Sequence, residues 1–146
     1  MEAARTLGNL SKSTVYRAEL VRCHLPEMLV LLLDHGSFAV VAAAAGTLVN
    51  LARDRSLAAN FEAAELLPRI MQLLELASEP VTHVACGAAL RTLYNLIVVG
   101  GAAVPNLGRM LERLRALREE LPHEADVLEE LERRLAGLRV AVEVEV

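Results

Sequence analysis

Apolar positions along the chain fall into segments with helical spacing. Nearly every position of residues 42–51 is apolar or small, a pattern that predicts a helix buried on several sides. Residues 107–138 instead carry one apolar stripe in each of two arms, separated by Pro122 and with Arg and Glu between the stripe positions. The stripe positions are Leu107, Met110, Leu114, Leu117, Leu121, Leu128, Leu131, Leu135 and Leu138. The pattern predicts an all-α fold that ends in a helical hairpin.

One short string, Thr-Leu-x-Asn-Leu, occurs three times in the chain. Its asparagines are Asn9, Asn50 and Asn95, which recur at intervals of 41 and 45 residues. An alanine precedes each asparagine by six residues, at Ala3, Ala44 and Ala89. Small residues at a fixed place on a helix allow neighbouring helices to approach closely, so each string is expected to end a closely packed helix.

A second landmark alternates with the first and consists of an apolar residue followed by proline. Proline is tolerated in the first turn of a helix, where its missing N–H would have no helical partner. A helix is therefore expected to begin at each of these steps. The steps are Leu25-Pro26, Leu67-Pro68 and Val104-Pro105. Two landmarks that alternate at a period of about 40 residues indicate a repeat protein.

The two alternating landmarks resemble those of the armadillo repeat family. The resemblance implies a right-handed α-solenoid of three-helix repeats, in which the second helix starts at the apolar-Pro step and the third ends in the asparagine string. It divides residues 1–138 into a partial repeat 1–12, repeats at about 13–54 and 55–98, and a degenerate capping unit 99–138. The capping unit is a helical hairpin, and its charged face suits the end of a stack. Residues 139–146 are expected to be a C-terminal tail. Because the chain starts inside a third helix, further repeats are expected to be able to pack against its N-terminal end.

The resemblance also implies a peptide-binding surface. In the family, the asparagine of the string lies on the concave face of the third helix, where its amide bonds to the backbone of an extended peptide. An amide offers both a donor and an acceptor and so can pair with a peptide unit whatever its side chain. Asn9, Asn50 and Asn95 hold the corresponding positions. The alternative is that each asparagine only ties its helix to its neighbour.

Cations lie about one helical turn from these asparagines. Arg5 and Arg91 come four residues before an asparagine, and Lys12 and Arg53 come three residues after one. This arrangement favours an extended partner that is acidic or phosphorylated. Import-receptor members of the family carry Trp four residues before the asparagine, where this chain has Arg5, Gly46 and Arg91, which argues against nuclear-localisation peptides as ligands. The alternative is that the cations are ordinary solvated charges.

Composition narrows the class of function. The 146 residues carry a formal net charge of −4, which argues against a nucleic-acid partner. The longest apolar runs, residues 28–33 and 38–48, are too short to cross a bilayer, so no membrane insertion is expected. The two cysteines, Cys23 and Cys86, form no short-spaced pair, which is typical of a reduced, cytoplasmic protein and leaves a nuclear or ciliary location open.

No grouping of residues in the sequence predicts an enzyme or a cofactor. His83 and Cys86 have the i, i+3 spacing of two metal ligands on one helix, but two ligands do not make a site and helix packing explains both. The leading hypothesis is therefore a protein-interaction module that holds an extended acidic peptide on its concave face. The alternative is a structural subunit of a larger cytoskeletal or ciliary assembly, docked through its ends.

Overall fold

The computed structural model describes the backbone of residues 2–144 and the side chains of these residues except 4 and 140–144. The described part is all-α and contains no strand. Short 3₁₀ turns precede three of the helices: η1 (Arg55–Leu57), η2 (Pro80–Thr82) and η4 (Pro122–Glu124). The α-helices are α1 (Glu2–Leu10), α2 (Thr14–Arg22), α3 (Leu25–Leu32), α4 (Phe38–Leu51), α5 (Ala58–Ala63), α6 (Leu66–Leu74), α7 (His83–Tyr94), α8 (Leu107–Glu120) and α9 (Ala125–Val144).

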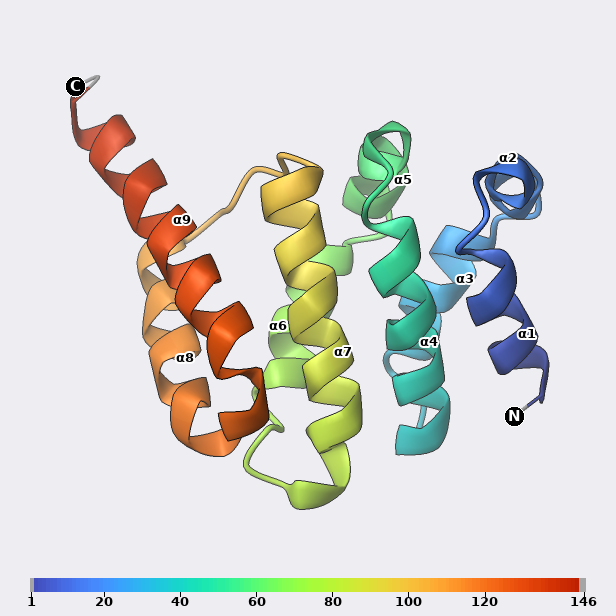
Figure 1. Cartoon of the computed structure of the whole chain (residues 1–146), viewed down its shortest axis with the longest axis horizontal. Helices are drawn as coiled ribbons and strands as arrows, with labels where there is room; N and C mark the ends of the chain where they lie inside the picture. The colour runs from blue at the N-terminus through green and yellow to red at the C-terminus, as the bar shows by residue number, and fades with distance from the viewer. Residues whose placement is uncertain (1, 145–146) are drawn as a thin grey trace.

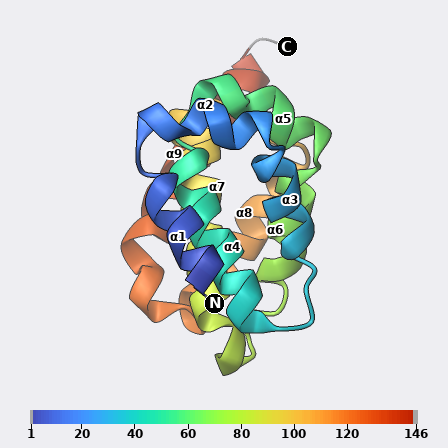
Figure 2. The same ribbon diagram turned by 90° about the vertical axis from the view of Figure 1, so that its right-hand side faces the viewer.

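The helices are arranged in rows. The third helices α1, α4 and α7 stand side by side with α9 at the end of the row, and the second helices α3, α6 and α8 form a row behind them (Figure 1). The first helices α2 and α5 lie across one edge of the stack, as the view along its length shows (Figure 2). Each third helix packs against the one before it, α4 on α1 and α7 on α4, and α9 packs on both α7 and α8.

The second helices share one backbone feature at their start. The residues that precede α3, α6 and α8 are His24, Glu65 and Asn106, with left-handed φ values of 56°, 58° and 54°. The predicted start of α3 at Leu25 is confirmed, and α6 begins one residue before the predicted Leu67. The predicted start at Val104 is wrong, because Pro105 precedes the left-handed residue Asn106 and α8 begins only at Leu107.

The core follows the repeated string. Leu48, Leu51 and Leu93 are fully buried, and Leu96 is 6% exposed. The alanines Ala44 and Ala89 are each 1% exposed, as expected for places where helices come close together. The threonines that open the second and third strings, Thr47 and Thr92, are also buried, and each donates a hydrogen bond to the carbonyl oxygen four residues earlier in its helix. The second and third strings are therefore packing motifs of the core.

The C-terminal hairpin confirms most of the predicted stripe. Met110, Leu114 and Leu117 of α8 are buried, and Leu128, Leu131 and Leu135 of α9 are fully buried. Leu138, the last predicted stripe position, is 46% exposed. The predicted tail is also wrong up to residue 144, because α9 continues through Val144. Neither proline nor glycine follows Gly137, so the alternating valines and charges do not interrupt a helix that is already formed.

One helical stretch passes a simple length and composition test for a membrane span. Residues 80–99, which comprise η2, α7 and a π-helical turn, η3 (Asn95–Val99), have a mean hydropathy of 1.2. Within this fold 61% of that stretch is buried. Burial by the neighbouring helices accounts for its apolar character, as for the central helix of any packed stack.

Candidate functional site: a groove between the third helices

A groove of about 410 Å³ lies between α1 and α4 on the face formed by the third helices. It brings together Arg5 and Asn9 of α1, Lys12 of the turn that follows α1, and Asn50 of α4. Glu2, Gly8, Ala43, Gly46 and Thr47 complete its lining. Arg5, Asn9 and Lys12 are exposed, and no other described residue forms a hydrogen bond or ion pair with their side chains. Four of the seven predicted site residues thus share one surface.

Asn50 lies at the floor of this groove and is partly occupied. Its side-chain nitrogen donates to the backbone carbonyl oxygen of Gly8 at 3.2 Å and to Oγ of Ser11 at 3.1 Å. These bonds tie α4 to the end of α1. The side-chain nitrogen of Asn50 therefore ties its helix to the neighbouring helix, which is the alternative to peptide binding. The residue is half-buried and still lines the groove, which leaves it within reach of a ligand.

Asn95 does not line this groove, and its role as a peptide contact stays a prediction. The residue is 8% exposed, and its side-chain nitrogen donates to the backbone carbonyl oxygen of Val49 at 2.8 Å. It also opens the π-helical turn η3, in which its own carbonyl oxygen accepts a hydrogen bond from the N–H of Gly100. The side-chain nitrogen of Asn95 therefore bonds within the α4–α7 interface.

Arg91 is exposed but already paired. Its guanidinium lies 2.9 Å from a carboxylate oxygen of Glu124, which comes from the turn that precedes α9. Room for this carboxylate exists because residue 87 is glycine: a Cβ there would lie 2.6 Å from the same oxygen of Glu124. The ion pair ties the C-terminal hairpin to α7. A ligand that binds Arg91 would therefore compete with Glu124 for its guanidinium.

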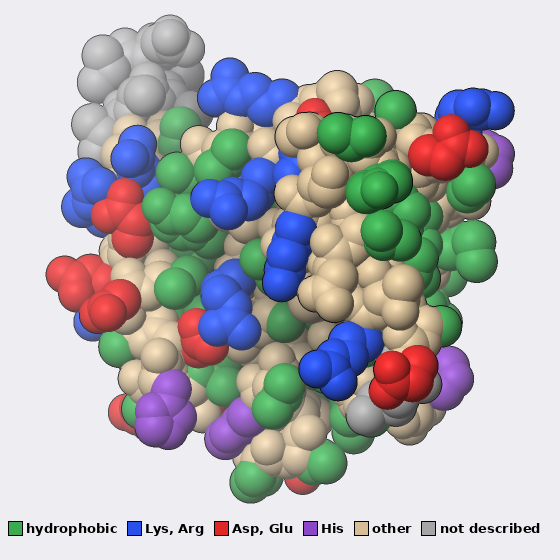
Figure 3. All heavy atoms as spheres, turned by 45° about the vertical axis from the view of Figure 1, so that its right-hand side comes forward, with side chains coloured by type: hydrophobic (Ala, Val, Ile, Leu, Met, Phe, Trp, Pro, Cys, Tyr) green, Lys and Arg blue, Asp and Glu red, His purple; other side chains and the backbone are tan. Residues whose placement is uncertain are grey.

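Arg53 is exposed just beyond the end of α4 and does not line the groove. The cations that line the groove, Arg5 and Lys12, therefore come from α1 and the turn that follows it. Lys and Arg side chains are spread over the face that the third helices present, and acidic side chains lie mostly toward its edges (Figure 3). Such a face can attract an anionic ligand.

Part of the chain that forms this groove matches a known protein family. Residues 13–53 match the family model described as Armadillo/beta-catenin-like repeat. The chain carries an armadillo repeat. Armadillo repeats generally mediate protein–protein interaction, and the family is typically non-enzymatic. No curated protein and no solved structure matches the chain.

The matched armadillo repeat spans α2, α3 and α4, so it contributes one wall of the groove. The other wall, α1, precedes the match and repeats the same asparagine string. The groove is thus the step between two consecutive third helices, which is where the resemblance places a bound peptide.

Cys86, the second residue of the His83 and Cys86 pair, has ordinary packing partners. Cys86 is fully buried, and its thiol lies 3.4 Å from the carbonyl oxygen of Leu73 and 3.6 Å from Oγ1 of Thr82. Burial raises the pKa of this thiol above its ordinary value. Among the described residues, no group of three or more His, Cys, Asp or Glu side chains is placed to hold a metal ion.

Two contacts that shape the site carry no sequence signal. Glu124 lies 33 residues from Arg91 in a stretch of regularly spaced charges, where nothing marks it as a partner. Ser11, which is fully buried and accepts from Asn50, stands just after the first string as an isolated serine. The shared sequence of the three strings favoured three equivalent asparagines, and only the packed neighbours distinguish them.

Proposed function

We propose that this armadillo-repeat chain is a protein-interaction module that binds an extended acidic or phosphorylated peptide in the groove between α1 and α4. The observation that carries the proposal is the gathering of Arg5, Asn9 and Lys12 around one groove, with no internal partner for their side chains among the described residues. Asn9 supplies a free amide for the peptide backbone, and the two cations supply charge for acidic side chains.

The binding surface is shorter than the spacing of the strings suggests. The side-chain nitrogen of Asn95 bonds to Val49 and Arg91 pairs with Glu124, so the free polar groups concentrate on α1, on the turn that follows it and on Asn50. An extended peptide advances about 3.3 Å per residue, so a step of about 10 Å between two helices accommodates about three residues. The affinity should therefore be modest and dominated by charge.

A direct test is fluorescence anisotropy with a labelled 12-residue peptide of alternating Glu and Ala, with a phosphoserine version alongside. Reversing both groove cations, Arg5→Glu with Lys12→Glu, should weaken binding about tenfold, because each exposed ion pair contributes up to about 1 kcal/mol and reversal adds repulsion. Arg109→Glu on α8 is the matched control, since Arg109 is exposed and lies outside the groove. Wild-type binding should also weaken between 50 and 300 mM salt. Equal affinities for the groove and control variants would remove the groove as the binding surface.

A second function, docking of the stack through its ends, is favoured by the apolar surface of the first unit. Val15 and Tyr16 of α2 are 80% and 51% exposed, and Met28 and Leu31 of α3 are 55% and 63% exposed. Large exposed apolar side chains gathered on one end of a solenoid favour a neighbour packed against it. Sedimentation analysis of wild type and of a Tyr16→Ser, Leu31→Ser variant would test this: association that the variant abolishes supports end docking, and a monomer at all concentrations argues against association between copies.

A further inference from the structure

The third unit of the stack lacks a first helix. α2 precedes the second helix of the first unit, and α5 precedes that of the second unit. The corresponding place before α8 holds residues 100–106, which form a loop without helix. The left-handed residues before the second helices, His24, Glu65 and Asn106, are spaced 41 residues apart and fix this correspondence.

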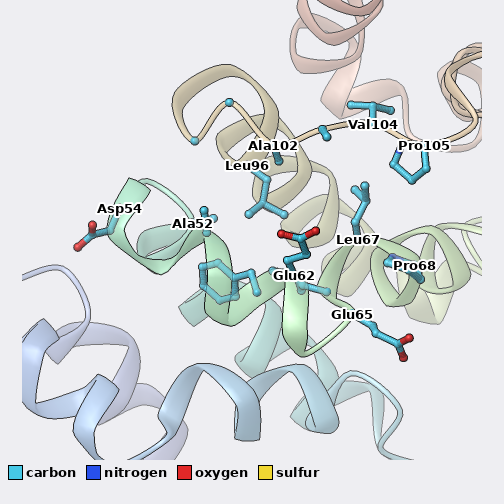
Figure 4. Close-up of a pocket in the computed structure, with 16 residues that line it drawn as sticks. Ala52, Asp54, Glu62, Glu65, Leu67, Pro68, Leu96, Ala102, Val104 and Pro105 are labelled. Carbon is cyan, nitrogen blue, oxygen red and sulfur yellow. The ribbon is translucent and has the colours of Figure 1, made fainter.

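A cavity of about 640 Å³ lies beside this loop. Its walls come from α5, from the start of α6 and from the loop, with Leu96 of η3 facing into it (Figure 4). The lining is mostly apolar and includes Phe61, Leu66, Leu67 and Val104. It shares no lining residue with the groove between α1 and α4.

The first unit shows what normally covers this place. There α5 packs over the start of α3, Pro26 is buried, and the side chain of Asn60 donates to a carboxylate oxygen of Glu27 at 2.9 Å. At the same places on α6, Leu67 is only half-buried and Pro68 is exposed. The side of α6 that corresponds to the covered side of α3 is therefore open for lack of a helix.

The charge at the opening indicates what kind of helix would fit. The carboxylate of Glu62 points into the cavity between Leu96 and Leu67, and that of Glu65 lies at the rim and points outward (Figure 4). Both residues are exposed, and no described residue forms an ion pair with either. The residue of α2 that corresponds to Glu62 is Val21, which packs against the core.

We infer that this cavity binds a single amphipathic helix from a partner protein, which takes the place of the missing first helix. The apolar face of the helix fills the cavity against Phe61, Leu67 and Leu96, and a Lys or Arg on its flank pairs with Glu62 and Glu65. Helix-in-groove binding of this kind is read out by apolar anchors at i, i+3, i+4 and i+7. The site is distinct from the groove, so it stands or falls independently of the proposed peptide function.

The probe is a synthetic 14-residue helical peptide with leucines on one face and lysines on its flanks. Its binding to the full chain is measured by anisotropy and located by changes in amide NMR signals. Shifts are expected at Ala58, Glu62 and Ala103. Glu62→Gln with Glu65→Gln should weaken binding about tenfold, because two exposed ion pairs are lost. Glu129→Gln on α9, an exposed acid remote in sequence from the cavity walls, should leave the affinity unchanged.

A second peptide, in which the leucines are replaced by serine and the lysines are kept, separates the cavity from simple attraction of a cationic peptide to an acidic chain. It should lose binding, and a peptide with Glu in place of Lys should bind less tightly than the original. The inference is overturned by signal changes confined to other surfaces, by equal affinities for the Glu62→Gln, Glu65→Gln variant and wild type, or by full binding of the serine peptide. Thermal unfolding of each variant confirms that the fold is intact.

Discussion

The side-chain nitrogen of Asn95 donates a hydrogen bond to the backbone carbonyl oxygen of Val49, across 2.8 Å. The bond joins the end of α7 to α4, and Asn50 makes the equivalent bond from α4 to the carbonyl oxygen of Gly8 in α1. A residue that repeats at the period of the stack thus fastens each third helix to the one before it. Asn9 has no described helix before α1 to bond to, and its side chain is exposed.

This difference predicts unequal effects of removing the asparagines. Asn95→Ala should lower the free energy of unfolding by about 1–3 kcal/mol, because a buried carbonyl group loses its partner. Asn9→Ala should change it by less than about 0.5 kcal/mol, as for other surface substitutions. Urea denaturation followed by circular dichroism measures both. A stable Asn95→Ala variant would show that the bond is dispensable.

The repeated leucines should dominate the stability. Leu93 is fully buried between third helices, so Leu93→Ala should cost about 2–5 kcal/mol through the lost transfer free energy and the cavity left behind. Leu138→Ala is the control, because Leu138 is 46% exposed and should contribute less than about 0.5 kcal/mol. Equal losses for the two variants in the same denaturation experiment would contradict the described packing of the third helices.

The two cysteines should differ in reactivity. Cys23 is exposed, whereas Cys86 is fully buried and burial raises the pKa of its thiol above the ordinary 9.0. Ellman's reagent should therefore modify one thiol in the native protein and the second only on unfolding. Because the folded state holds the Cys86 proton more tightly, its contribution to stability is complete below pH 9.0 and falls as the pH rises toward the raised folded pKa. Cys86→Ala should lose this alkaline dependence.

The bond between α5 and α3 should be visible in acid. The side chain of Asn60 donates to Glu27, and this hydrogen bond lowers the pKa of the Glu27 carboxyl below its ordinary 4.5. The stabilisation is therefore present above pH 4.5 and is lost as the pH falls through the lowered folded pKa.

Asn60→Ala should accordingly lower the free energy of unfolding by about 1 kcal/mol at neutral pH, and the difference from wild type should shrink below pH 4.5. Gln72→Ala on α6, an exposed position, serves as the control. Denaturation midpoints measured from pH 7 to pH 3 provide the test. A difference that stays constant over this range would separate the bond from the charge of Glu27.

The local pattern of apolar and polar residues was sufficient to predict the helices and most of the buried core residues. The helix break predicted at Pro122 lies between α8 and α9, and the leucines of the second and third strings are buried as expected. The predicted start at Val104 failed because a proline marks the approach to a helix as well as its first turn, and Asn106 takes the left-handed conformation between them. The helix through Val144 was missed because alternating valines and charges are also typical of a strand.

The spacing of apolar residues along the sequence reflects the position of each residue on its helix. The sequence alone therefore determines the repeat, the helical class and the apolar face of each helix. The binding surface depends on what lies against that face, which is a relation between residues far apart in the chain. Only the packed structure assigns Asn95 to Val49 and Arg91 to Glu124 while leaving Asn9, Arg5 and Lys12 free of internal partners among the described residues. The cavity beside α5 has the same origin, because an absent helix leaves its mark in the exposure of Leu67 and Pro68 and not in their identity.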